Sequence, residues 1–314
     1  MGIPEAETIK EAAKRIAPFI HRTPVLTSDN INAILKTNLY FKCENFQKVG
    51  AFKYRGATNA VQQLSESQLH KGVATHSSGN HAQALALAAK IKNVAAYIVM
   101  PRNAPKSKKD AVIGYGAKVI ECEPTLEARE STIEQVIHEK NAYFIHPYND
   151  YTIIAGQATC AMELFEEVSG LDFLLAPVGG GGLLSGSALA AHYFSPGTIT
   201  IGTEPSGADD AFRSLKEGKI IPSINPKTIA DGLLTSLGSK TFPIIQEYVS
   251  QILTVDESSI IEAMRLIWQR MKIVIEPSSA VPLAAVMENQ HLFKGKKIGI
   301  ILSGGNVDLN KLPF

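Results

Sequence analysis

Short apolar runs alternate along this chain with longer stretches of helical composition or spacing. The runs have the length of buried strands, and the stretches between them have the length of helices. Strands are therefore predicted at 38–43, 72–76, 95–100, 118–122, 143–145, 172–178, 198–203 and 297–302. Helices are predicted at 8–17, 56–64, 81–90, 106–115, 127–140 and 183–193. This alternation is typical of an α/β fold with mainly parallel sheets flanked by helices.

The later part of the chain carries one further helix signal. The tetrapeptide Thr254-Val255-Asp256-Glu257 has the capping-box pattern, and an apolar stripe at helical spacing follows it as far as Met271. No low-complexity linker interrupts the chain, so two domains in close contact are expected. The middle section resembles a compact βαβ unit, which predicts a small domain at 69–150 and a large domain made of 1–68 and 151–314.

Composition narrows the functional classes. The 314 residues are 45% hydrophobic and 19% charged with a net charge of +1, which gives no electrostatic case for nucleic acid or an anionic membrane as a partner. No apolar run reaches the length of a membrane span, and no signal peptide is evident. Cys43, Cys122 and Cys160 lack zinc-type spacing and are expected to be reduced, buried thiols. A cytoplasmic protein is expected.

One lysine is followed along the chain by three glycine-rich loops. Lys53 lies in the run 50–57 (GAFKYRGA), and the loops are 77–81 (SSGNH), 179–183 (GGGGL) and 303–306 (SGGN). Glycines between a strand and a helix let backbone N–H groups converge on an anion. An amine combined with several anion cradles suggests a phosphorylated aldehyde, namely pyridoxal 5′-phosphate (PLP), held on Lys53 as a Schiff base.

Each loop also has a plainer interpretation. The loop at 179–182 follows an apolar strand and precedes a helix, as an anion cradle does, although a flexible linker is the alternative. The free N–H groups at 77–81 suit a carboxylate, but Ser and Asn are also common helix caps. Ser303 follows the last predicted strand, where it could donate to a heterocyclic nitrogen or occupy an ordinary turn.

An acidic turn follows the strand at 198–203. Glu204, Asp209 and Asp210 crowd this turn, and two carboxylates with a backbone carbonyl and waters would suit Mg²⁺ or Ca²⁺. An exposed acidic turn without a metal ion is the alternative.

These motifs together resemble the fold type II PLP enzymes, most closely serine racemase of the eukaryotic type and the serine/threonine dehydratases. The resemblance spans nearly the whole chain. It lies in the segments 41–47 (FKCENFQ), 50–57 (GAFKYRGA), 77–83 (SSGNHAQ), 155–157 (AGQ), 228–232 (TIADG) and 303–308 (SGGNVD). Tyr148 is a local departure, because some serine racemases carry a different side chain at this position.

The resemblance implies a role for each motif residue. Lys53 would be the Schiff-base lysine and the proton carrier on one face of the cofactor, and Ser78 would be the carrier on the other face. Phe52 would pack on the pyridine ring, Asn80 would bond its 3-hydroxyl, and Ser303 would bond its nitrogen. The phosphate would be held by Gly179, Gly180, Gly181, Gly182 and Leu183. The substrate would meet Ser77, Ser78, Gly79, Asn80, His81 and Arg129, although Arg129 could also be a surface residue of its helix.

The resemblance also implies a metal site and an activity. Glu204, the Ala208 carbonyl and Asp210 would hold Mg²⁺ or Ca²⁺, with Mn²⁺ as a further candidate. The expected enzyme is a racemase and ammonia-lyase for L-serine, D-serine and L-threonine, with 3-hydroxyaspartate as a further candidate. Two alternatives stay open: a β-replacement enzyme of the cysteine synthase type, and a non-catalytic PLP or amino-acid sensor. A homodimer is expected, with a nucleotide effector as a candidate partner.

Overall fold

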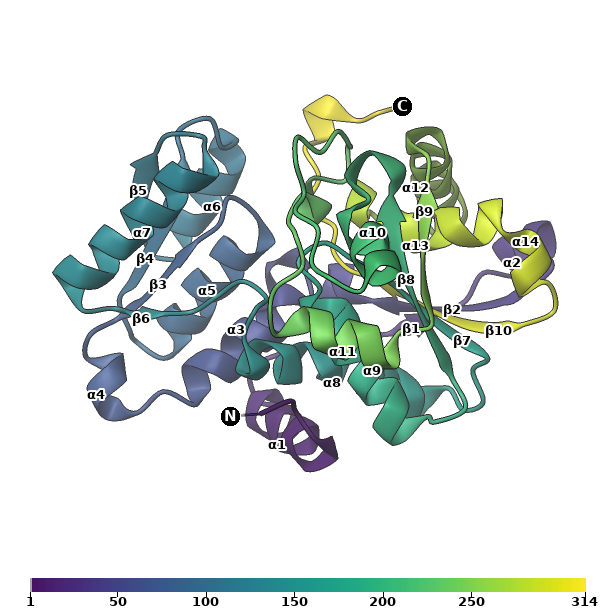
Figure 1. Ribbon diagram of the computed structural model, residues 1–314, viewed down its shortest axis with the longest axis horizontal. Coiled ribbons are helices and arrows are strands. Elements are labelled where there is room, and N and C mark those ends of the chain that lie inside the picture. The colour runs from purple at the N-terminus through teal and green to yellow at the C-terminus, as the bar shows by residue number, and fades with distance from the viewer. Residues whose placement is uncertain (1) are drawn as a thin grey trace.

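The computed structural model describes residues 2–314, whose strands form two sheets. Figure 1 shows the smaller sheet on the left and the larger one on the right. The strands are β1 (Val25–Leu26), β2 (Asn38–Cys43), β3 (Val73–His76), β4 (Ala96–Pro101), β5 (Lys118–Cys122), β6 (Tyr143–Phe144), β7 (Phe173–Pro177), β8 (Ile199–Pro205), β9 (Gln251–Val255) and β10 (Lys297–Leu302). Every predicted strand forms, whereas β1 and β9 were not predicted.

Helices connect the strands and cover both sheets. They are α1 (Ala6–Ile16), α2 (Asp29–Leu35), α3 (Lys53–Gln62), α4 (Glu66–Leu69), α5 (Asn80–Ile91), α6 (Lys106–Gly114), α7 (Leu126–Lys140), α8 (Tyr151–Glu167), α9 (Gly182–Phe194), α10 (Asp210–Glu217), α11 (Thr241–Tyr248), α12 (Glu257–Met271), α13 (Pro277–Glu288) and α14 (Gln290–Phe293). Short 3-10 turns occur at η1 (Glu44–Phe46), η2 (Lys48–Gly50), η3 (Ser206–Ala208), η4 (Asp231–Leu233) and η5 (Leu309–Lys311). Within this described part of the chain, no helix is long and apolar enough to cross a membrane.

Two local predictions were wrong. The predicted helix at 56–64 begins earlier, at Lys53, so the lysine lies on the first turn of α3. The capping box at Thr254 does not form, because Thr254 pairs with Glu204 as part of β9, and the helix begins after Asp256 without a side-chain cap. Pairing with a neighbouring strand satisfies the backbone at Thr254, which a local helix signal cannot anticipate.

The smaller sheet has the order β5-β4-β3-β6, and all its strands are parallel. Its helices are α5, α6 and α7, which pack on strands β3 to β5. This is the section in which the sequence predicted a βαβ unit. Because every connection is a parallel crossover, the loops that follow β3 and β4 lie at the same edge of the sheet.

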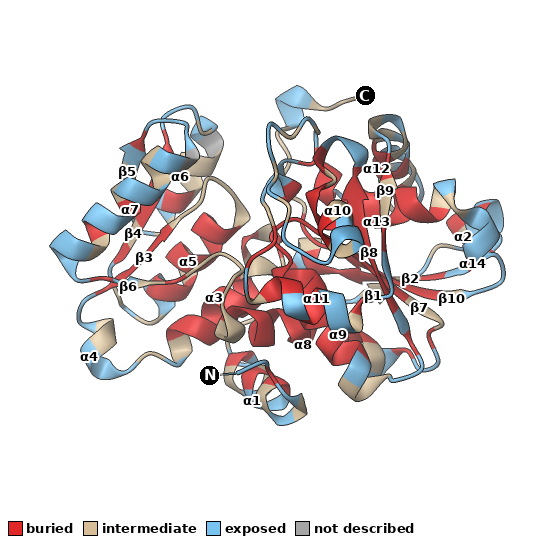
Figure 2. Cartoon of the chain, viewed as in Figure 1, coloured by how far each residue is buried: buried red, intermediate tan, exposed pale blue. Residues whose placement is uncertain are grey.

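The larger sheet has the order β1-β2-β10-β7-β8-β9, and only the pairing of β1 with β2 is antiparallel. Neighbouring residues of β7 face opposite cores: Leu174 packs with α8 and α9, and Leu175 packs with α12 and α13. Figure 2 shows the buried residues concentrated in these strands and in the helices on either side. Cys43, Cys122 and Cys160 are unpaired and buried, as predicted.

This topology brings distant loops to one edge. The lysine turn follows β2, the four-glycine loop follows β7, and the loop at 303–306 follows β10, which lies between β2 and β7. An isolated bridge joins Ala51 to Gly304, and the N–H of Phe52 donates to the Ser303 carbonyl at 3.0 Å. Ligands bind outside the carboxyl ends of parallel strands, so this edge is the place to look for a site.

Candidate active site

Lys53 lies on the first turn of α3, directly after a tight turn in which Val49 and Gly50 have positive φ angles of 58° and 69°. Its amine donates to the Pro147 carbonyl at 2.9 Å and forms no ion pair among the described residues. Burial lowers the pKa of this amine to about 8, and the nearby carboxylate of Glu276 opposes that shift. The neutral form, which attack on an aldehyde requires, is therefore more accessible near physiological pH than it is for an exposed lysine.

Aromatic rings surround the amine. Its nitrogen lies 5.2 Å from the centre of the Phe52 ring and 5.9 Å from that of Tyr148. His146 packs edge-on against Tyr148 with ring centres 4.7 Å apart, and its Nδ1 accepts from the N–H of Asn149 at 2.8 Å. Burial lowers the pKa of His146 to about 4, so this ring is neutral and adds no charge near the lysine. The sequence did not single out His146.

The four-glycine loop precedes α9, and Gly181 in it has a φ of +90°. A Cβ at Gly180 would lie 2.4 Å from the Tyr148 ring, and one at Gly179 would lie 3.0 Å from the Leu233 Cα, so side chains would not fit. The backbone N–H groups of Gly180 to Leu183 find no hydrogen-bond acceptor among residues 2–314. Free N–H groups at the beginning of a helix fit a phosphate, as the sequence predicted for Gly179 to Leu183.

Asn80 is held by two partners that lie far away in the chain. Its amide nitrogen donates to both carboxylate oxygens of Glu276, at 2.9 and 3.1 Å, and its oxygen accepts from the side chain of Asn306 at 2.9 Å. Burial raises the pKa of Glu276 to about 7. The sequence analysis did not identify Glu276. The one sequence feature that could have pointed to it is its place as a lone carboxylate between an apolar stretch and Pro277.

Ser303 is buried and lies beside a second serine. Its hydroxyl is 3.1 Å from that of Ser279, which in turn donates to the Gly304 carbonyl at 2.6 Å. Since Ser279 uses its proton on that carbonyl, Ser303 is the donor between the two hydroxyls. Its hydroxyl would have to rotate to donate to a ring nitrogen. The sequence did not identify Ser279.

The Ser77 turn connects β3 to α5 in the smaller sheet. The N–H of Gly79 donates to the Ser77 hydroxyl at 3.3 Å, whereas those of Asn80 and His81 have no acceptor in the described structure. Burial holds the pKa of His81 well below its usual range, with the charge of Lys53 acting in the same direction. The Ser78 side chain is partly exposed and forms no hydrogen bond within residues 2–314, so nothing in the structure joins it to Lys53.

Arg129 lies on α7 and is partly buried. Burial and the positive charge of Arg129 both lower the pKa of His76, the last residue of β3. The charge of Arg129 therefore acts on the residue directly before the Ser77 turn. Its Nε donates to the Thr125 carbonyl of its own helix at 3.3 Å.

The acidic turn is buried, unlike the exposed alternative considered from the sequence. Glu204 and Asp210 are 0% and 1% exposed, and Ala208 is buried between them. The Glu204 carboxylate accepts from the N–H groups of Ala211 and Phe212 at 3.0 and 2.9 Å. Neither oxygen of Asp210 has a hydrogen-bond partner at ordinary geometry within residues 2–314, although the Ser223 hydroxyl is close enough to lower the pKa of this carboxylate. Burial raises the pKa of Glu204 to about 9 and that of Asp210 to about 6.

Two buried carboxylates without a cation would be stabilised by a divalent ion. Asp209, the third acid of the turn, instead pairs with Arg213 at 2.8 Å on the surface. The described residues contain no group of three acidic, histidine or cysteine side chains that could hold a metal ion. The donor set is thus limited to two carboxylates and a carbonyl, which would rely on waters to complete the coordination.

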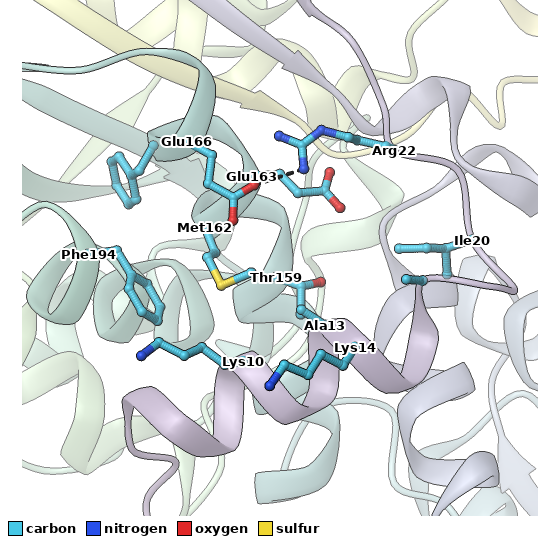
Figure 3. A pocket seen from close by; sticks show the side chains of 12 residues that line it. Lys10, Ala13, Lys14, Ile20, Arg22, Thr159, Met162, Glu163, Glu166 and Phe194 are labelled. Atoms are coloured by element: carbon cyan, nitrogen blue, oxygen red, sulfur yellow. Dashed lines mark hydrogen bonds and ion pairs between the residues drawn. The ribbon is translucent and has the colours of Figure 1, made fainter.

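A separate cavity of about 580 Å³ lies between α1, α8 and α9 (Figure 3). Its lining includes Met162, Phe194 and the cations Lys10, Lys14 and Arg22. None of the described residues predicted for the active site contributes to this lining. The cavity therefore does not belong to the lysine site.

Comparison with known proteins agrees with this geometry. The family described as "Pyridoxal-phosphate dependent enzyme" matches residues 16–304, so the chain belongs to this family of enzymes. A beta-hydroxyaspartate dehydratase from Paracoccus denitrificans (strain Pd 1222) is 52% identical over 314 residues, with 100% of both chains covered. The L-threo-3-hydroxyaspartate ammonia-lyase of Saccharomyces cerevisiae is 48% identical over 312 residues, which are 99% of this chain and 96% of that one.

A solved structure extends the comparison to the fold. The crystal structure of serine racemase from Dictyostelium discoideum superposes with a TM-score of 0.93 at 52% identity, covering 97% of this chain and 99% of the other. The predicted α/β fold and the resemblance to fold type II PLP enzymes are confirmed. The buried amine of Lys53 and the open N–H groups before α9 fit the aldehyde and the phosphate of PLP.

Proposed function

We propose that this chain is a PLP-dependent racemase and ammonia-lyase for small 3-hydroxy amino acids, with L-serine, D-serine, L-threonine and 3-hydroxyaspartate as candidate substrates. The observation that carries the proposal is the partly neutral Lys53 amine, enclosed by rings at the edge where the anion-binding loops meet. The relatives described above, named for serine racemisation and for removal of ammonia or water from hydroxyaspartate, support this range of substrates.

Each residue of the site would have a separate role in binding or proton transfer. PLP, when bound, supplies the electron sink that makes the α-proton of an amino acid acidic. Amides of the glycine loop would hold the phosphate, with Phe52 against the ring and Asn80 beside its hydroxyl. Ser303 offers a hydroxyl rather than a carboxylate to the ring nitrogen, which favours β-elimination over transamination. The Lys53 nitrogen would take the α-proton on one face.

Two different reactions would begin with this removal of the α-proton. Return of a proton by the Ser78 hydroxyl on the opposite face would give the other enantiomer. Loss of the β-hydroxyl as water, followed by hydrolysis of the released product, would instead give a keto acid and ammonia. The unpaired N–H groups at the beginning of α5 support a role for Ser77 to His81 in binding the substrate carboxylate. Arg129 would meet the second carboxylate of 3-hydroxyaspartate.

The segment 69–150 would form a small domain that closes over the substrate, with 1–68 and 151–314 as the large domain. The smaller sheet and its helices lie within this segment, which also carries the Ser77 turn. An ion pair between Lys108 and Asp231, 2.5 Å apart, joins the segment to the rest of the chain. Such a contact between the two parts is consistent with closure.

A divalent cation, Mg²⁺ or Ca²⁺ with Mn²⁺ as a third candidate, would bind to Glu204, the Ala208 carbonyl and Asp210. The unpartnered, buried Asp210 carboxylate supports this part of the proposal. In the described part of the chain, no hydrogen bond or ion pair joins these residues to Lys53, so the ion would stabilise the fold rather than touch the substrate.

The proposal also includes a homodimer, which light scattering of the purified protein would test. Exposed apolar side chains support it: Phe46 and Val274 are 43% and 46% exposed, and the Asn45 side chain bonds to the Val274 carbonyl. A cytoplasmic location remains the expectation drawn from the sequence, and a nucleotide effector rests on the resemblance.

The test is to incubate the PLP-loaded protein with each candidate substrate and to measure keto acid and enantiomer together. We expect both products from serine and none from a Lys53→Ala variant. Formation of cysteine from O-acetylserine and sulfide, without either product from serine, would favour the β-replacement enzyme. Bound PLP without turnover of any substrate would favour the sensor.

A further inference from the structure

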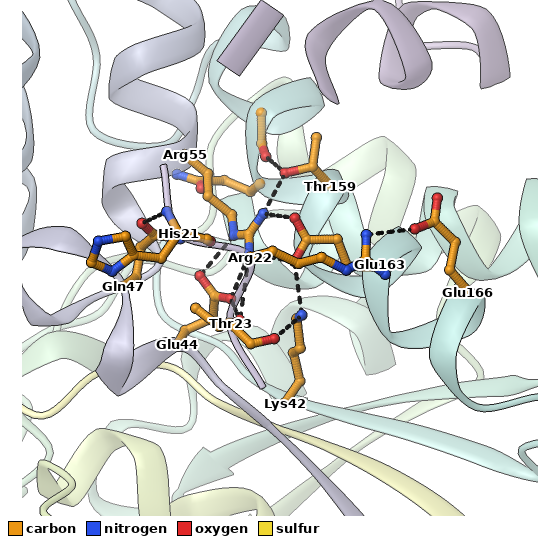
Figure 4. Close-up of polar contacts among 12 residues, drawn as sticks. His21, Arg22, Thr23, Lys42, Glu44, Gln47, Arg55, Thr159, Glu163 and Glu166 are labelled. Carbon is orange, nitrogen blue, oxygen red and sulfur yellow. Dashed lines mark hydrogen bonds and ion pairs between the residues drawn. The ribbon is translucent and has the colours of Figure 1, made fainter. Parts of the chain in front are cut away.

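Arg55 follows Lys53 by two residues, and its side chain is completely buried. Its guanidinium binds two carboxylates, each through two nitrogen atoms (Figure 4). Nε and Nη2 donate to Glu44 at 2.8 Å each, and Nη1 and Nη2 donate to Glu163 at 2.7 Å each. Nη1 also donates to the Thr159 hydroxyl at 3.2 Å. All five N–H groups of this guanidinium thus have acceptors close by.

A second cation completes the cluster. Lys42 is also 0% exposed, and its amine donates to Glu163 and to the Thr23 carbonyl at 2.7 Å each. The Thr23 hydroxyl donates to Glu44 at 2.6 Å. Two cations and two carboxylates are therefore buried together. Burial of such groups costs desolvation energy that apolar side chains would avoid, so the cluster is weak evidence for stability and its position has to be considered as well.

The place of Arg55 on its helix suggests a role for this cluster. Residues two apart on an α-helix point about 200° apart, so Lys53 and Arg55 leave the first turn of α3 on opposite sides. Lys53 reaches forward to Pro147, and Arg55 reaches back to Glu44 in η1 and Glu163 on α8. The carboxylates of Glu44 and Glu163 therefore bind the first turn of α3 on the side opposite the lysine amine.

Backbone contacts anchor both ends of this turn. The N–H of Phe52 donates to the Ser303 carbonyl at 3.0 Å, and the N–H of Gly56 donates to the Gln157 side chain at 3.1 Å. The N-cap residue Phe52 forms no side-chain cap, and the first turn of α3 contains no acidic residue. Among the described side chains of the turn, Arg55 is the one that bonds to charged groups, so its fork is the main side-chain anchor.

We propose that Arg55 is a positioning residue, which sets the location of the Lys53 amine through its paired bonds to Glu44 and Glu163. This inference rests on the proposed role of Lys53. A lysine at position 55 would keep the charge but would lose the planar fork that binds two carboxylates at once. The first turn of α3 would then be free to shift, and a displacement of about 1 Å can cost about 10²-fold in rate.

The test compares Arg55→Lys with Lys42→Met, a matched control in the same cluster. Both variants remove buried bonds to Glu163, so both should melt at lower temperature than the wild type. Only Arg55→Lys should lower kcat, by about 10- to 10²-fold, with KM changed by less than about threefold. It should also slow trapping of PLP on Lys53 by borohydride reduction, which a peptide mass measurement quantifies without any substrate. Lys42→Met should trap PLP at the wild-type rate.

The outcomes separate the two claims. Wild-type trapping and kcat in Arg55→Lys would overturn the positioning role, as would equal losses in Arg55→Lys and Lys42→Met. If Arg55→Lys does not fold, Glu44→Gln takes its place: it weakens one of the two paired carboxylate bonds of Arg55 and should slow trapping, and an unchanged rate would overturn the role. Failure of the wild type itself to trap PLP on Lys53 would overturn the proposed function, and this inference with it.

Discussion

Replacing Gly180 with alanine tests the glycine cradle through one methyl group. That Cβ would meet three atoms of the Tyr148 ring at 2.4 to 2.5 Å, whereas carbon atoms in contact ordinarily lie about 3.5–4.0 Å apart. The ring has to retreat by about 1 Å. It cannot do so freely, because His146 packs against it and accepts the N–H of Tyr148 at 3.2 Å. Gly180→Ala should therefore strain the wall of the lysine site.

The size of the effect follows from overpacking, which typically costs about 1–3 kcal/mol. In a chain of 314 residues, this loss corresponds to a fall in melting temperature of roughly 1.5–4.5 °C. If the same strain opposes cofactor binding, PLP affinity should fall by about 5- to 150-fold, since about 1.4 kcal/mol is a factor of ten. Melting curves and a PLP titration followed by visible absorbance measure both quantities.

Gly197→Ala is the matched control, because a Cβ there has no neighbour within 4 Å and the φ angle of Gly197 is not positive. A Tyr148→Ala change should relieve the clash, so the double variant with Gly180→Ala should lose less than the sum of the two single variants, by about 0.5–3 kcal/mol. The reasoning fails if Gly180→Ala behaves like Gly197→Ala, or if the two losses simply add.

Three further predictions follow from the site. Ser78→Ala should suppress racemisation and turnover of D-serine more strongly than elimination from L-serine, and the two effects should differ by about 10²-fold or more. Assays of enantiomer and keto acid would measure both effects. Equal losses would indicate that Ser78 is a helix cap. The rate at which cofactor-free protein takes up PLP should rise with pH through about 8. Burial lowers the pKa of the Lys53 amine, and only the neutral amine attacks the aldehyde of PLP. A rise only near pH 10 would contradict this prediction. A chelator should lower the melting temperature, and Mg²⁺ or Ca²⁺ should restore it. The melting temperature of Asp210→Ala should not respond to chelator or ion, although this variant should keep its PLP absorbance. A wild-type response in Asp210→Ala would refute the metal site.

Local patterns determined much of the fold. The strand predicted at 38–43 coincides with β2, and that at 118–122 coincides with β5. Alternation of strands and helices predicted parallel sheets, and each glycine loop was correctly placed directly after a strand. These features could be read from the sequence because burial and backbone propensity act over a few neighbouring residues.

Elements whose local signal was weak or misleading were missed. The long helix α8 lies in a stretch with little contrast between faces, because nearly all its residues are buried. At Thr254 the sequence favoured a helix cap, and pairing with β8 made it a strand instead. In both places the tertiary environment outweighed the local preference.

The sequence by itself determined the class of enzyme and the motif residues, since lysine and glycine loops are contiguous segments. Only the tertiary structure decided what surrounds them. Glu276 reaches Asn80 across 196 residues, and Glu163 reaches Arg55 across 108. The sequence also left the exposure of the acidic turn open, and the fold buries both Glu204 and Asp210. Burial, shifted pKa values and ion pairs depend on which distant segments come into contact. A local sequence pattern does not predict those contacts.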